Sequence, residues 1–256
     1  MGFLDDAIRF QQHVQKITSE HFELMPDFAY FSEFHERDIG GYLRYLSDQS
    51  SSKPLTSGQT FLSSLSCLLG PVLESIGYRN KISRARPKIG SFHASQGLVG
   101  SVKNLSFEAY HFAEYLKLFL DSARSVAVNL SVSDSINLTM GSAIKNFKNK
   151  NKEFMTYRNF IVHGSTNRND PFRYIRFFEL GAITLHSDLW LDFHNIFNEE
   201  RDAWNDRAKN LLKDMVDCLS VIQGMNERLL SANRYTFAPK ASAPQVGDRT
   251  VNVQQT

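Results

Sequence analysis

Three neighbouring side chains could bind an anion and transfer a proton. They lie in residues 157 to 164, Tyr-Arg-Asn-Phe-Ile-Val-His-Gly, and no other part of the chain concentrates such groups. Arg158 supplies a permanent positive charge suited to phosphate, Asn159 a side-chain amide, and His163 an imidazole that exchanges protons near neutral pH. Together they would suit chemistry on a phosphate group.

A helix over residues 152 to 163 would position these groups. Side chains one turn apart share a face of a helix. The polar stripe would then comprise Lys152, Thr156, Asn159 and His163, and the apolar stripe Phe147, Phe154 and Ile161. Arg158 falls in the apolar phase, so its guanidinium must reach around the helix or lie at a packed contact with a partner. Gly164 suits the residue after the last turn, which His163 would then occupy.

The string of Arg, four residues and His, with Asn directly after the Arg and Gly directly after the His, resembles the active-site motif of the HEPN superfamily. The resemblance covers about eight residues, Tyr157 to Gly164, and more loosely the surrounding helical pattern. It implies a helical bundle, and many members are metal-independent endoribonucleases of toxin–antitoxin, CRISPR and anti-phage systems. It also implies a homodimer, because the family builds its site from two facing motifs.

The expected reaction is attack of the RNA 2′-hydroxyl, which leaves a 2′,3′-cyclic phosphate. We assign His163 to proton transfer, Arg158 to the phosphate, and Asn159 to orienting either of them. No cofactor and no metal ion is expected. RNA, a second copy of the chain, and an antitoxin or a defence-system protein are the expected partners.

Positive charge surrounds the motif although the net charge of the chain is only +2. Basic residues outnumber acidic ones eight to two between Lys145 and Arg176, and a second basic cluster runs from Arg79 to Lys88. Such side chains contact phosphates without reading sequence. The residues predicted to bind RNA are Lys148, Lys152, Arg168, Arg84 and Arg86. A solvated lysine face is the alternative explanation for either cluster.

Composition and hydropathy indicate a cytoplasmic globular protein. The hydrophobic fraction of 42% suffices for a core. No stretch approaches the roughly 18 uncharged apolar residues of a membrane helix, and acidic residues near the N-terminus do not suit a signal peptide. No contact with a membrane is expected. Cys67 and Cys218 lie far apart in apolar runs and are predicted to be core residues.

The remaining patterns predict a mainly α fold, an elaborated helical bundle over residues 1 to 232, followed by a disordered tail at 233 to 256. Further helices are expected at 3–25, 27–47, 61–76 and 105–130, from a cap at Ser133 or Asp134 into the motif, and at 199–230. A β-hairpin insertion is predicted at about 174 to 187. Loops at 79 to 101 and 165 to 173 would contact substrate.

Two other interpretations stay open. A non-catalytic HEPN-like module that binds RNA or nucleotide, or scaffolds a partner, would keep the basic surface without depending on His163. The motif could also be a coincidence in a helical protein, with Arg158 capping carbonyl groups and His163 packing at a helix end.

Overall fold

The computed structural model describes residues 2–21, 57–87, 94–127, 130–163, 170–184 and 188–231. These residues are almost entirely helical, and none of them forms a β-strand, so the predicted helical bundle is confirmed. The helices are α1 (Phe3–His21), α4 (Ser57–Cys67), α5 (Leu69–Arg84), α6 (Gln96–Val126), α7 (Leu130–Lys150), α8 (Lys152–His163), α9 (Arg173–Thr184) and α10 (Leu189–Ser231).

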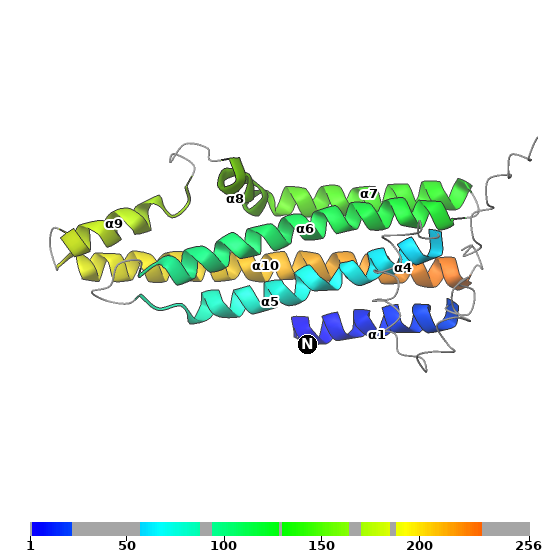
Figure 1. Ribbon diagram of the computed structural model, residues 1–256, viewed down its shortest axis with the longest axis horizontal. Helices are drawn as coiled ribbons and strands as arrows, with labels where there is room; N and C mark the ends of the chain where they lie inside the picture. The colour runs from blue at the N-terminus through cyan, green and yellow to red at the C-terminus, as the bar shows by residue number, and fades with distance from the viewer. Residues whose placement is uncertain are drawn as a thin grey trace, which may run out of the picture.

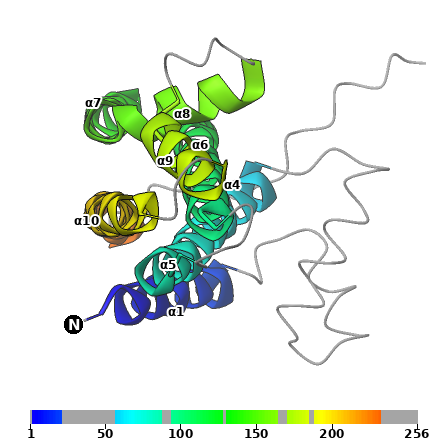
Figure 2. The same ribbon diagram turned by 90° about the vertical axis from the view of Figure 1, so that its left-hand side faces the viewer.

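The bundle is elongated because two long helices run along it side by side. The 43 residues of α10 correspond to roughly 65 Å at the usual rise per residue. Figure 1 shows α6 and α10 along the long axis, with α5 and α4 on one side and α7 on the other. Seen from the end, α6 lies between α5 and α8, while α1 covers the outer side of α5 (Figure 2).

Helix α6 has a buried face along its whole length. Its buried positions recur every three or four residues, from Leu98 through Phe112 to Val126, which is the pattern of a core-facing helix. The ring of Phe112 lies 5.1 Å from Phe147 of α7, and that of Phe119 lies 5.7 Å from Phe61 of α4, between ring centroids. Helix α8, which carries the motif, and its neighbours α7 and α10 all pack on α6.

The predicted hairpin at 174–187 is wrong, because Arg173–Thr184 is the helix α9. Aromatic residues favour a strand by propensity, but here the packing requires a helical period. Ile175, Glu179 and Ala182 are buried on one face of α9. The start signal lies just upstream, where the side-chain oxygen of Asp170 accepts a hydrogen bond from the Phe172 N–H at 3.0 Å.

A buried carboxylate fixes α9 against the start of α6. Both oxygens of Glu179 accept hydrogen bonds from Ser95, from its backbone N–H at 3.2 Å and from its hydroxyl at 2.6 Å. The positive end of the α6 dipole favours a carboxylate at this place. Burying an isolated carboxylate would be costly. These hydrogen bonds offset that cost and allow Glu179 to be only 7% exposed.

Several helix limits differ from those predicted. The expected substrate-contact loop at 79–101 is helical at both ends, since α5 continues to Arg84 and α6 begins at Gln96. Ser133 and Asp134 lie inside α7, which starts at Leu130, so neither caps it. The last helix starts at Leu189, ten residues earlier than predicted. The predicted helix at 27–47 and the tail at 233–256 lie outside the described residues.

The chain turns a corner at Asn151 instead of continuing one helix into the motif. Lys150 ends α7, Asn151 forms a turn, and α8 starts at Lys152. The Asn151 side-chain amide donates to the Phe147 carbonyl and to Asp214 of α10, both at 3.0 Å, and Lys150 binds the other oxygen of Asp214 at 3.0 Å. Asp214 therefore connects the corner to α10.

Replacing Asp214 with Ala should destabilise the protein by about 1–3 kcal/mol, because the nearly buried amide of Asn151 loses an acceptor. The free energy of unfolding, measured in urea, checks this. Asp217→Ala is the matched control, since that carboxylate lies on the same helix, is exposed and makes no described hydrogen bond. Equal losses in the two variants would contradict a role for Asp214 at the corner.

Candidate active site

Helix α8 spans Lys152–His163, as the sequence predicted, and its buried face packs into an aromatic cluster. Phe154 and Tyr157 are its fully buried positions. The centroid of the Phe154 ring lies 5.7 Å from Trp204 of α10, and that of Tyr157 lies 5.7 Å from Phe172. Phe172 in turn stacks on Trp204 at 5.5 Å. We call Phe154, Tyr157, Phe172 and Trp204 the aromatic cluster.

Arg158 lies at a packed contact, one of the two positions expected for it. Its Cζ lies 4.0 Å from the centroid of the Tyr110 ring of α6, a cation–π distance. Nη1 donates to Asn159 Oδ1 at 3.2 Å, and the buried Nε has no hydrogen-bond partner among the described groups. The partner of this arginine is therefore an aromatic face, which leaves guanidinium N–H groups available for an anion.

Asn159 and His163 lie on the exposed surface of α8. The side-chain oxygen of Asn159 is engaged by Arg158, so the part of this amide left to contact another group is its NH₂. His163 is the last residue of the helix, as predicted, and residues 164–169 after it lie outside the described part of the chain. Arg168 is among them.

Within one chain, the side chains of Arg158 and His163 leave the helix in different directions. Arg158 and His163 are five residues apart, which corresponds to about 7.5 Å along a helix and about 140° around it. Arg158 points toward Tyr110 of α6, and His163 is exposed at the helix end. A phosphate held by Arg158 would therefore need a histidine from elsewhere to receive or donate its proton.

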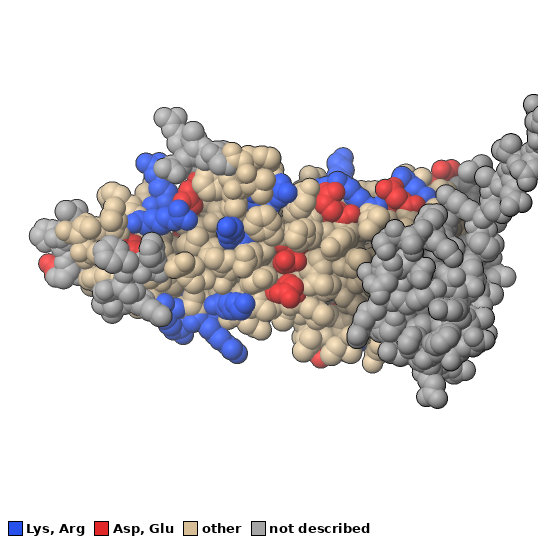
Figure 3. Space-filling model, viewed as in Figure 1, with Lys and Arg blue, Asp and Glu red and all other residues tan. Residues whose placement is uncertain are grey.

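The predicted RNA-binding lysines flank α8, but the arginines of the second basic cluster do not. Lys148 lies on α7 and Lys152 at the first residue of α8. Arg84 and Arg86 are exposed at the end of α5, which lies across α6 from α8 (Figure 1). Basic side chains gather on the half of the molecule that carries α9 and the end of α5 (Figure 3). Any RNA touching both groups would have to cross α6.

Lys117 is a basic residue beside Lys148 that the sequence did not single out. Its Nζ binds Glu114 at 2.7 Å, and the Lys148 Nζ lies 3.5 Å from the same carboxylate. Burial and the charge of Lys117 lower the pKa of Lys148. Two ammonium groups thus share one carboxylate, one turn along α6 from Tyr110, and an added phosphate would relieve their repulsion. The spacing of three residues between Glu114 and Lys117 could have predicted their ion pair from the sequence.

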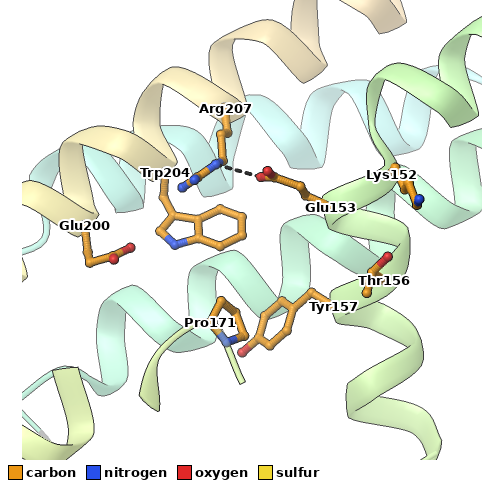
Figure 4. Close-up of a pocket in the computed structure, with 8 residues that line it drawn as sticks. All are labelled: Lys152, Glu153, Thr156, Tyr157, Pro171, Glu200, Trp204 and Arg207. Atoms are coloured by element: carbon orange, nitrogen blue, oxygen red, sulfur yellow. Dashed lines mark ion pairs between the residues drawn. The ribbon is translucent and has the colours of Figure 1, made fainter. Parts of the chain in front are cut away.

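A cavity of about 390 Å³ opens between α8 and α10. Its lining, drawn in Figure 4, comprises Lys152, Glu153, Thr156, Tyr157, Pro171, Glu200, Trp204 and Arg207. Lys152 and Thr156 belong to the polar stripe that leads to Asn159 and His163. The sequence pattern predicted Trp204 as core, and its 3% exposure agrees, but the pattern gave no indication of a cavity beside it.

The described residues contain no group of three or more His, Cys, Asp or Glu side chains placed to hold a metal ion. Cys218 is buried and Cys67 partly buried, and both are free thiols whose pKa is raised by burial. Among the described residues, one helical stretch, Thr60–Arg84, is long and apolar enough on average to cross a membrane, although it contains charged residues such as Glu74 and Arg79. It comprises most of α4 and all of α5, which pack on α6 in the bundle.

Comparison with known proteins places the chain in no group. No family model, no curated protein and no solved structure matches it.

Replacing Tyr157 with Phe should protect the protein against alkaline unfolding. Burial raises the pKa of Tyr157 to about 12 from its ordinary 10.0, so folding favours the neutral phenol. Its contribution is complete below about pH 10 and is lost as the pH rises toward 12. We expect the free energy of unfolding to fall less for Tyr157→Phe than for the wild type between about pH 10 and pH 12.

The comparison isolates Tyr157, because Cys218, whose pKa burial raises to about 12, is present in both proteins. Parallel losses of stability in the two proteins would show that the Tyr157 hydroxyl does not ionise with unfolding.

Proposed function

We propose that the chain is a HEPN-type endoribonuclease that acts as a homodimer and cleaves RNA without a metal ion. The observation that carries the proposal is the geometry of α8. This short helix ends at His163 and holds Arg158 against Tyr110, with guanidinium donors left for an anion. The resemblance to the HEPN motif supplies the reaction, and a toxin or anti-phage role rests on that resemblance alone.

In the proposed reaction the 2′-oxygen attacks the adjacent phosphorus and gives its proton to a base. The bond from phosphorus to the 5′-oxygen breaks, and that oxygen receives a proton. The products are a 2′,3′-cyclic phosphate and a 5′-hydroxyl. Guanidinium groups would stabilise the negative charge that develops on the phosphate oxygens.

The divergence of Arg158 and His163 favours a site made by two chains. With two copies of α8 facing each other, the histidine of one chain could approach a phosphate held by the arginine of the other. Both proton transfers would then have an imidazole, one acting as base and one as acid. A single copy presents one imidazole, on a residue about 140° around the helix from its own arginine.

The alternative is a non-catalytic HEPN-like module that binds RNA or nucleotide. The cavity beside α8 favours it, because a binding module needs a pocket but no exposed histidine. Cleavage that depends on His163 separates the two functions.

His163→Ala and Arg158→Ala should each reduce RNA cleavage by at least about a hundredfold, the lower end of general acid–base contributions. The assay incubates purified protein with total cellular RNA in EDTA and measures fragmentation. His194→Ala is the matched control, since that histidine lies on α10 and contacts Asn198 rather than α8. Full activity in either motif variant would overturn the assignment, and RNA binding without cleavage by the wild type would favour the binding module.

A further inference from the structure

The cavity between α8 and α10 has the size and the position of a site for one ring of the substrate. Its volume of about 390 Å³ falls at the lower end of small-molecule sites, which span roughly 300–1,000 Å³. Thr156 on its wall is three residues before Asn159, or about 4.5 Å along the helix. Thr156, Asn159 and His163 share the polar face of α8, so an RNA strand that runs along this face toward His163 could place a base here.

A cation and a carboxylate both line the α10 wall of the cavity, with Trp204 between them (Figure 4). Arg207 lies 4.7 Å above the Trp204 ring and binds Glu153 of α8 at 2.7 Å, so the guanidinium is held in place across the cavity mouth (Figure 4). Arginine held in this way offers N–H donors and a planar face to a ligand. Lys152 adds a second positive charge on the α8 wall.

Glu200 is the carboxylate, and no described cation lies within ion-pair distance of it. Burial raises its pKa, and the charge of Arg207 opposes that effect only in part. The buried Nε1 of Trp204, one turn along α10, has no acceptor in hydrogen-bonding geometry. The indole N–H nevertheless lies close enough to Glu200 to lower the pKa of that carboxyl, which favours its ionised form. A ligand that brings N–H donors to Glu200 would favour its ionised form.

Among the four bases, guanine has hydrogen-bonding groups that complement both Glu200 and Arg207. Its N1–H and N2–H₂ groups are adjacent donors that can bind both oxygens of one carboxylate, while its O6 and N7 accept from arginine. Adenine and cytosine each place a ring acceptor beside their amino group, which would face a carboxylate with a lone pair. Uracil offers one N–H between two carbonyl oxygens.

We propose that the cavity lined by Glu200, Arg207 and Tyr157 recognises a guanine base of the RNA substrate. The inference rests on the proposed function for the RNA, whereas the recognition of guanine rests on the cavity. Glu200 would accept from the Watson–Crick edge, Arg207 would donate to O6 or N7, and Tyr157 would supply an aromatic wall. Free guanine nucleotides share this chemistry.

Tryptophan fluorescence can report binding directly, because the chain has two tryptophans and only Trp204 lines the cavity. In Trp190→Phe protein, GMP should change the Trp204 emission saturably, with at least about tenfold higher affinity than AMP, CMP or UMP. Inorganic phosphate should leave the emission unchanged. Equal responses to the four nucleotides, or a response to phosphate alone, would overturn the proposal.

Glu200→Gln should weaken GMP binding by about 5- to 150-fold, the range for a bidentate contact, because the amide can accept through only one atom. Glu199→Gln is the matched control, since that neighbouring carboxylate is exposed and does not line the cavity. Equal affinities in the two variants would remove Glu200 from the site. The comparison of GMP with AMP needs no variant at Glu200, so it decides the question even if Glu200→Gln does not fold.

Short oligonucleotides distinguish RNA from free nucleotide. His163→Ala, Trp190→Phe protein should bind an RNA octamer with one central G more tightly than GMP, and more tightly than the octamer with A there. Preference for GMP alone would overturn the substrate assignment and leave a guanine-nucleotide site. If the protein discriminates between bases but the wild type cleaves no RNA, the guanine site is supported and the nuclease function is refuted. If the wild type cleaves RNA without preference for G, the nuclease function is supported and the guanine site is refuted.

Discussion

The packing of four aromatic rings between α8, α10 and the start of α9 determines where the motif lies. A helix of 12 residues is marginal by itself in water, so α8 depends on tertiary contacts. Phe154 and Tyr157 supply them from α8, and Phe172 and Trp204 complete the cluster. The Asn151 corner turns the chain out of α7, and the aromatic cluster then fixes the helix that ends at His163. The cavity occurs at the edge of the same cluster.

Arg158 shows how a charge can stand on the packed side of this helix. Stacking on Tyr110 gives the cation a favourable surface and restricts its rotamers, at the expense of an Nε without a partner. The restriction lowers the conformational entropy lost when an anion binds. It also directs the guanidinium toward α6, and in the proposed enzyme a second copy would supply the histidine. The Lys117 and Lys148 pair continues the positive surface along α6.

The sequence pattern predicted a helix correctly where residues close together in the chain determine the structure. The period of Phe154 and Ile161, with Gly164 after the last turn, predicted the end of α8 at His163 but not the break from α7 at Asn151. Pattern failed at α9 because its aromatic residues favour strands, whereas the helix is stabilised by contacts far along the chain, such as that of Glu179 with Ser95, 84 residues away. The cavity could not be predicted for the same reason. Its lining combines residues of α8 with Glu200 and Arg207 of α10, which are distant in sequence and come together only in the folded chain. Arg158 was an intermediate case, in which the helical phase predicted a packed contact but could not name Tyr110.

The central claim is that this helix carries a site for cleavage by the RNA 2′-hydroxyl. The most direct measurement uses a labelled oligonucleotide cut by the wild-type protein at one mapped position, and the same oligonucleotide with a single 2′-deoxynucleotide 5′ to the scissile phosphate. If the 2′-hydroxyl is the nucleophile, cleavage at that phosphate should disappear while binding is retained, because the attacking oxygen is missing. Cleavage of the substituted bond at an unchanged rate would contradict the account, since the nucleophile would then have to come from water or the protein.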